Sequence, residues 1–124
     1  MTTYSVVGKP VTREDGPEKV SGSHLYSADI ILAGMIWGKV LRCPYAHAKI
    51  LSIDTTEAAR LPGVHAVLTG KDVAGMRVGR YMRDVPPLAE EKVRFVGERV
   101  AAVAADDPDI AEEALNLIEV EYQE

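Results

Sequence analysis

The chain has 124 residues, 47% of them hydrophobic and 27% charged, with a formal net charge of −5 at pH 7. This length fits one domain with its own core, and the mixed, acidic charge argues against nucleic acid as a partner, which needs a basic stripe. The lone cysteine excludes an internal disulfide and favours a cytoplasmic protein. The sequence contains neither a secretory signal nor an apolar run of ~18 residues, so neither export nor a membrane span is predicted.

Residues 1–23 are expected to form an extended N-terminal arm, and residues 24–124 the folded domain. Glycines and prolines interrupt the arm, and no apolar periodicity survives in it. A polar arm of this kind is costly to order by itself, so we expect it to be disordered or to lie on another surface.

The next part of the chain is expected to supply three strands, over residues 24–31, 35–42 and 48–54. Their β-branched and aromatic residues favour a pleated surface. Pro44 ends the second of these strands, because proline lacks the N–H that a sheet ladder needs. The connector over residues 43–47 can return the chain antiparallel or send it to a neighbouring sheet, and its length leaves both open.

Two helices are predicted, over about residues 55–61 and 108–117. Asp54, with Glu57 three residues later, is typical of a capping box. Asp107 is a favourable N-cap because a proline follows it at the first helical position. The apolar face of the second helix is expected to contain Ile110, Ala111, Ala114, Leu117 and Ile118.

Further strands are expected over residues 64–69, 92–96, 99–105 and 118–122. The run 99–105 is apolar without alternation, which is typical of a strand buried on both faces. These elements predict an α+β fold with a mixed β-sheet and two helices. The sequence then stops without a tail, and we expect it to be part of something longer.

Residues 74–90 form the least regular stretch of the chain. Glycines, prolines and methionines gather there with Arg77, Arg80, Arg83 and Tyr81. A loop of this length in a compact domain is usually functional or mobile. The arginines either form a solvated face or contact an anion or substrate, since guanidinium forks suit carboxylates and phosphates.

No catalytic group of residues is apparent from the sequence alone. Cys43 and His47 could supply two metal ligands at most, whereas structural zinc needs four, and no sequence context supports a Cys–His nucleophile. The glycines lack the spacing of a phosphate-binding loop. Glu98 is expected to form a structural ion pair with Arg94 or Arg99.

A series of short motifs in a characteristic order carries a family resemblance. The motifs are Gly8-Lys9-Pro10-Val11, Arg13-Glu14-Asp15-Gly16, Lys19-Val20-Ser21-Gly22, Tyr26-x-x-Asp29-Ile30, Gly34-Met35-Ile36-x-Gly38-x-Val40-Leu41-Arg42, Pro44-Tyr45-Ala46-His47-Ala48-x-Ile50-x-x-Ile53-Asp54, Ala58-x-x-Leu61-Pro62-Gly63-Val64, Thr69-Gly70-x-Asp72, Pro87-Leu88-Ala89 and Val93-Arg94-Phe95-Val96-Gly97-Glu98. Together they resemble the N-terminal α/β-hammerhead domain of the large, molybdenum-binding subunit of the xanthine dehydrogenase and aldehyde oxidase family. The resemblance covers nearly the whole chain. Four positions depart from the usual family pattern: Ser21 stands for threonine, His24 for alanine, Cys43 for serine and Arg99 for proline.

The resemblance implies a domain of a molybdopterin-dependent oxidoreductase. In that family, later domains of the same subunit hold the molybdenum cofactor and the catalytic glutamate, and electrons leave through [2Fe-2S] clusters to FAD on partner domains or subunits. No catalytic, cofactor-binding or metal-binding residue is therefore expected in these 124 residues. The isolated fragment is expected to be inactive.

The resemblance also implies one site. In the family, the loop before the P-L-A and V-x-x-V-G motifs lines the funnel from solvent to molybdenum, which places Arg80, Tyr81, Met82 and Arg83 at the substrate funnel. Purine, aldehyde, carbon monoxide and aromatic thioester enzymes share this domain, so the substrate stays open. A stand-alone, non-catalytic interaction module with the hammerhead shape is the alternative. A lipoyl or biotin carrier is excluded because no lysine stands in the required hairpin setting.

Overall fold

The computed structural model describes residues 4–124, so the first three residues of the predicted arm lie outside the described part. The chain falls into two compact units, Met1–Gly34 and Met35–Glu124. We call the second the hammerhead unit, after the fold that the resemblance predicts for it. Over residues 4–124, none of the helices has the length and apolar character needed to cross a bilayer.

The N-terminal unit contains short helices where the sequence analysis expected an arm and a strand. Helix α1 spans Gly16–Ser21, and Gly22 ends it in the left-handed conformation that glycine adopts easily. The strand predicted over residues 24–31 is wrong: a 3-10 helix, η1 (Ser27–Asp29), stands there, closed by the Tyr26 N–H donating to the Asp29 carboxylate at 2.9 Å. None of residues 4–34 is buried, so this unit has no core of its own.

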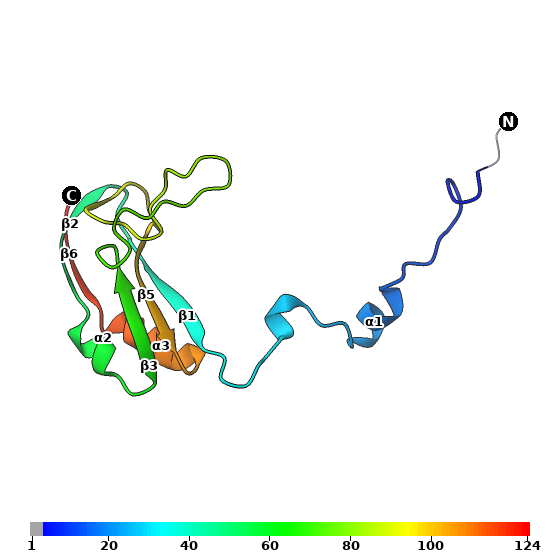
Figure 1. Ribbon diagram of the computed structural model, residues 1–124, viewed down its shortest axis with the longest axis horizontal. Coiled ribbons are helices and arrows are strands. Elements are labelled where there is room, and N and C mark those ends of the chain that lie inside the picture. The colour runs from blue at the N-terminus through cyan, green and yellow to red at the C-terminus, as the bar shows by residue number, and fades with distance from the viewer. Residues whose placement is uncertain (1–3) are drawn as a thin grey trace. The chain divides into compact units, whose positions relative to one another are not determined.

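The hammerhead unit contains two three-stranded sheets (Figure 1). The first has the order β1 (Trp37–Arg42), β5 (Arg99–Ala105), β3 (Val64–Thr69), and the second the order β4 (Lys92–Val93), β2 (Ala48–Asp54), β6 (Glu119–Gln123). The predicted α+β class is confirmed. Every pairing is antiparallel, so the expected mixed sheet is corrected to two antiparallel sheets. The connector over residues 43–47 sends the chain to the other sheet, which settles the alternative that its length left open.

The two predicted helices are present in this unit as α2 (Thr56–Arg60) and α3 (Pro108–Asn116). Asp107 caps α3 as predicted, since its carboxylate accepts from two backbone N–H groups, each at 2.8 Å. The predicted capping box of α2 is wrong. The Asp54 carboxylate accepts from the Thr56 N–H, and Glu57 instead pairs with Arg60 on the same helix.

The core lies between these layers and is built largely from small residues. Strand β5 is buried along most of its length, as its apolar run predicts, and α3 packs against it and against β1. One core cluster, with Ala58, Ala101 and Ala114 at its centre, joins the helices to the sheets. The predicted apolar face is confirmed at Ala111, Ala114 and Ile118, which are buried. It is wrong at Leu117, which is 37% exposed, and the buried Leu115 was missed.

A second core cluster joins the two sheets at the end that carries the irregular segment. Its fully buried members are Cys43, Ala48, Ala89, Val93 and Val100. Because Ala89 and Val93 bracket the end of residues 74–90, this cluster anchors one end of that segment to the body of the unit.

Candidate functional site

An antiparallel hairpin closes the middle of the irregular segment. Val78 and Val85 form an isolated β-bridge in which each backbone N–H donates to the other's carbonyl oxygen, at 2.8 and 3.2 Å. Residues 79–84 form the turn of this 78–85 hairpin. The loop that carries it projects beyond the ends of the strands (Figure 1).

Gly79 makes the tight turn of the hairpin possible. A Cβ atom built on Gly79 would lie 1.6 Å from the carbonyl oxygen of Met82, which is far inside van der Waals contact. Only glycine therefore allows the two limbs of the turn to approach this closely.

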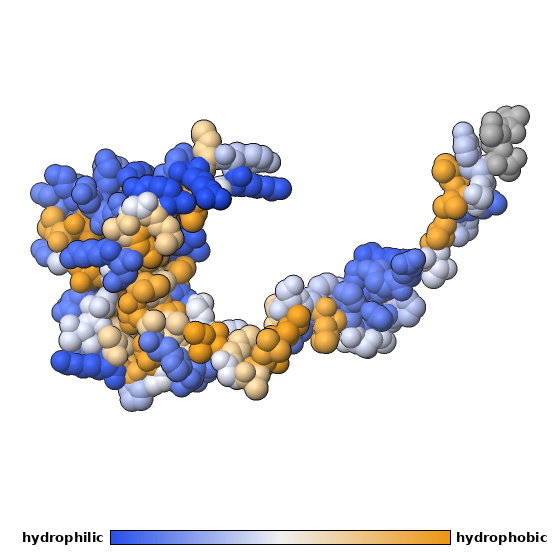
Figure 2. Space-filling view, in the orientation of Figure 1, coloured by the Kyte–Doolittle hydropathy of each residue, from blue (hydrophilic) through white to orange (hydrophobic). Residues whose placement is uncertain are grey.

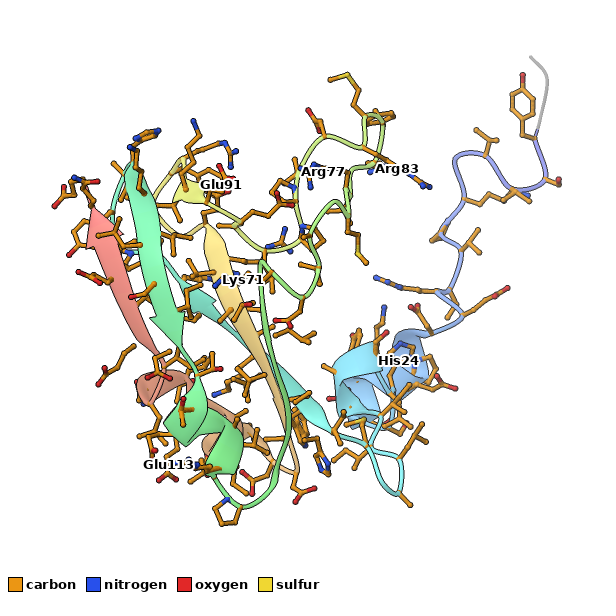
Figure 3. The ribbon with its side chains drawn as sticks, turned by 60° about the vertical axis from the view of Figure 1, so that its left-hand side comes forward. His24, Lys71, Arg77, Arg83, Glu91 and Glu113 are labelled. Carbon is orange, nitrogen blue, oxygen red and sulfur yellow. The ribbon has the colours of Figure 1, made fainter. Side chains whose placement is uncertain are left out.

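The four predicted funnel residues all lie on the turn and point into solvent. The Tyr81 side chain is 91% exposed and Met82 is 71% exposed. The Arg80 guanidinium carbon lies 5.7 Å from the centre of the Tyr81 ring, within the range of a cation–π contact. Figure 2 shows strongly hydrophilic residues on this projecting loop, and Figure 3 labels Arg83 on it. The structure thus gathers the four residues in one place, and their contact with a substrate stays a prediction.

The base of the hairpin is braced by one ion pair. Arg77 Nη1 lies 2.6 Å from Glu90 Oε1, and the same guanidinium donates to the Met76 carbonyl at 2.8 Å. Glu90 also accepts from the Gly75 N–H at 3.3 Å. The Arg77 hydrogen bond, followed by that of Gly75, holds the pKa of the Glu90 carboxyl below its usual value. Arg77 is therefore a structural residue, distinct from Arg80 and Arg83 on the turn.

Sequence reasoning missed Glu90 and Gly79. Glu90 stands thirteen residues beyond Arg77, a separation at which no local pattern links an acid to a base. Gly79 stands between Val78 and Arg80, so no turn dipeptide such as Asn-Gly or Asp-Gly marked it as a hairpin residue.

Glu98 forms the structural ion pair that the sequence analysis expected, and its partner is Arg94. The Glu98 residue is only 7% exposed, and its carboxylate accepts from the Arg94 backbone N–H and lies 3.4 Å from Arg94 Nη1. A buried carboxylate needs such partners because desolvating an unpaired charge is costly.

Cys43 and His47 do not form a nucleophilic pair in the described structure. Cys43 is buried, and its sulfur accepts from the Tyr45 N–H at 3.3 Å, whereas His47 is exposed. Burial, and then the adjacent Cys43, raise the pKa of the Tyr122 hydroxyl. Cys43 therefore packs in the cluster that joins the two sheets, with Tyr122 against it, and His47 lies at the surface.

The described residues do not provide a metal centre. Within residues 4–124, no three His, Cys, Asp or Glu side chains gather closely enough to hold a metal ion. In the same part of the chain, every buried side-chain nitrogen or oxygen has a hydrogen-bond partner. No buried side-chain donor or acceptor described here is therefore left for a cofactor to satisfy.

Comparison with known proteins gives one consistent family. The family model described as aldehyde oxidase and xanthine dehydrogenase, a/b hammerhead domain, matches residues 21–124. A probable xanthine dehydrogenase subunit of Bacillus subtilis (strain 168) is 49% identical over 121 residues, which cover 96% of this chain and 16% of that protein. The nicotinate dehydrogenase large molybdopterin subunit of Eubacterium barkeri is 39% identical over 98% of this chain and 29% of its own.

Solved structures agree with the sequence relatives. Quinoline 2-oxidoreductase from Pseudomonas putida 86 matches with a TM-score of 0.88 and 43% identity, over 94% of this chain and 16% of that chain. The chain thus spans less than a third of the length of each of these relatives.

Proposed function

This chain belongs to the aldehyde oxidase and xanthine dehydrogenase family, and from that membership we propose that its 78–85 hairpin lines the substrate funnel of a molybdenum hydroxylase. The chain is the hammerhead domain found in the large subunits of such enzymes. The stand-alone interaction module is not favoured, because the relatives that contain this domain are several times longer than the chain.

One observation carries the proposal: four side chains suited to recognition stand exposed on a turn whose base is held rigidly. An aromatic ring and a flexible thioether can together hold a flat substrate. Arginines beside them can attract an anionic one. The Val78–Val85 bridge and the Arg77–Glu90 pair fix the base of the turn, so that the tip is presented in a defined direction.

The reacting groups of the enzyme are assigned to other parts of the parent subunit. One relative is named a large molybdopterin subunit, and we place the corresponding cofactor of this enzyme in domains outside the hammerhead unit. The described residues themselves do not fit such a cofactor, since they offer neither a metal-ligand cluster nor an unsatisfied buried polar group. No reaction step is therefore derived for these residues.

The parent enzyme is proposed to pass electrons to iron–sulfur and FAD domains or subunits in the cytoplasm. The lone cysteine of this chain, buried and without a disulfide partner, supports the reducing compartment. The isolated hammerhead unit is expected to turn over no substrate.

The funnel role is tested by replacing Tyr81 and Met82 with alanine in the full-length parent enzyme. Turnover is measured on whichever of xanthine, nicotinate, quinoline and carbon monoxide the purified enzyme oxidises. We expect kcat/KM to fall about tenfold, which corresponds to about 1.4 kcal/mol of transition-state binding.

Leu117→Ala, at the residue that follows α3, serves as the matched control, since Leu117 is also exposed but lies far from the hairpin in sequence. Both variants should keep the wild-type melting temperature, because exposed side chains contribute little to stability. Unchanged kcat/KM in a hairpin variant with full cofactor content would refute the funnel role.

A further inference from the structure

Two arginines face each other across neighbouring strands at the hairpin end of the hammerhead unit. Strands β1 and β5 pair so that Arg42 is the cross-strand partner of Arg99, next to an irregularity in the register. Like charges directly opposite each other destabilise an antiparallel pair. Both side chains are exposed, and a negative group placed between them would stabilise this end of the strand pair.

The described part of the chain supplies no such negative group. Glu98 precedes Arg99 directly, but its carboxylate is buried and bonded to Arg94. The Arg42 guanidinium donates to the neutral Gly97 carbonyl at 2.9 Å. Within residues 4–124, neither Arg42 nor Arg99 takes part in a salt bridge, although the chain as a whole is acidic.

The two arginines line a surface hollow of about 210 Å³ that also has an apolar wall. Phe95, Pro86 and Pro87 contribute to this wall. Phe95 is 56% exposed, so this wall presents apolar surface to solvent, and Val96, next to it in the chain, is 64% exposed. The site therefore combines uncompensated positive charge with exposed hydrophobic area.

An adjoining hollow is also lined by arginines, but these are paired with acids. The second hollow, of about 310 Å³, shares Phe95 and Pro86 with the first and is lined by Arg77 and Arg94. Both of these arginines are already paired, with Glu90 and Glu98 respectively. Glu98 lines both hollows and is paired with Arg94, so of these two hollows in the described residues only the first contains arginines, Arg42 and Arg99, that are in no salt bridge.

We infer that the hollow between Arg42 and Arg99 is a docking site for an acidic side chain, Asp or Glu, carried by another domain of the same subunit. The inference rests on the proposed function, in which this chain is one domain of a longer subunit, and the chain spans only 16% of the B. subtilis relative. A free anion would leave Phe95 and Val96 in water, whereas a protein segment that presents a carboxylate covers them. Two guanidinium groups bind a carboxylate through charge-assisted hydrogen bonds.

Docking at this hollow also bears on the hairpin. Val85 lines the hollow and is half of the β-bridge that closes the hairpin. A segment seated in the hollow therefore contacts the hairpin at its base and helps to set the direction of the turn.

Zero-length cross-linking of the full-length subunit tests the docking site. Arg42→Lys and Arg99→Lys keep the charge and introduce an amine, which a carbodiimide joins to an adjacent carboxylate as an amide. Mass spectrometry of the digested protein then identifies the acid. We expect both variants to be joined to one Asp or Glu outside residues 1–124, in yields about tenfold above background, as close charged pairing requires.

Arg60→Lys on α2 is the matched control. Arg60 pairs with Glu57 on its own helix, so its amine should be joined to Glu57. Cross-links from positions 42 and 99 that reach only acids within residues 1–124, or no acid at all while the control reacts, would overturn the docking site.

Inorganic phosphate supplies an independent second measurement. If phosphate raises the melting temperature of the wild-type subunit but not of an Arg42→Gln, Arg99→Gln variant, the hollow binds a free anion and docking is overturned. No such difference is expected, because the docked carboxylate already occupies the arginines. The funnel role of Tyr81 and Met82 is measured separately by kcat/KM, so either proposal can fail alone.

Discussion

The β5–α3 layer and the 78–85 hairpin are opposite in almost every physical respect. Ala101 on β5 and Ala114 on α3 are fully buried, whereas Tyr81 on the hairpin is 91% exposed. The layer is held by close contact between small side chains, and the hairpin by backbone hydrogen bonds and one ion pair. The difference teaches that the residues that stabilise the fold are separate from those proposed to recognise substrate, so each set can be changed without the other.

The largest effect is expected from Ala114→Leu, which forces three extra carbon atoms into the β5–α3 layer. Ala114 belongs to one core cluster with Ala58 and Ala101, and all three are fully buried. Overpacking of such a site costs about 3 kcal/mol of the free energy of unfolding. Urea denaturation followed by circular dichroism measures this loss.

Glu113→Leu, on the exposed face of the same helix, is the control, and should change the free energy of unfolding by less than about 0.5 kcal/mol. If Ala114→Leu proves as mild as this control, the layer is not the tightly packed region described here, and the comparison fails.

A smaller effect is expected from Asp107→Ala, which removes the N-cap of α3 and leaves its packing intact. The Asp107 carboxylate accepts from the Asp109 and Ile110 N–H groups, each at 2.8 Å. Loss of a cap of this kind costs about 1 kcal/mol, read from the same urea curves. Asp109→Ala keeps the cap and should cost only a few tenths of that, about 0.3 kcal/mol from the helix dipole.

The smallest effect is expected from lowering the pH, which protonates Glu90 and weakens the Arg77–Glu90 pair at the base of the hairpin. Its pKa is lowered from the usual 4.5, so the folded state favours the charged form. The contribution of the Arg77–Glu90 pair is therefore complete above pH 4.5 and is lost as pH falls through the depressed value. The amide proton of Gly75, which bonds to Glu90, should report this titration by NMR while core amides stay unchanged.

Two variants sharpen this result. Arg77→Gln should move the Gly75 titration up toward the ordinary pKa of a glutamate, because it removes the larger cause of the shift. Glu90→Gln should abolish the titration. A Gly75 amide that still titrates in Glu90→Gln would assign the proton to another group.

Prediction from the sequence was most accurate for elements whose bounds are set by the residues next to them in the chain. β2, β3 and β5 have the predicted bounds, since each is an apolar run limited by proline, glycine or acidic residues. Helix α3 begins where an Asp-Pro pair requires it to begin. These signals act within a few residues and need no knowledge of the rest of the fold.

Prediction failed where a distant partner decides. Residues 24–31 have the composition of a strand, but no described strand lies beside them, and an isolated strand is not stable. The division into two antiparallel sheets depends on where the connector at residues 43–47 leads, which its length cannot specify. At the candidate site, Tyr81 and Met82 could be placed on a loop, but the brace between Arg77 and Glu90 could not.

Strand β3 makes the hammerhead unit prone to self-association in concentrated solution. The other strands at the sheet edges carry charged side chains that discourage pairing between copies: Lys39 on β1, Lys92 on β4, and Glu119 and Glu121 on β6. β3 carries no Lys, Arg, Asp or Glu, and its Leu68 is 43% exposed. Edge-to-edge aggregation of the excised unit should therefore begin along β3, and this strand is the place to add a gatekeeping charge.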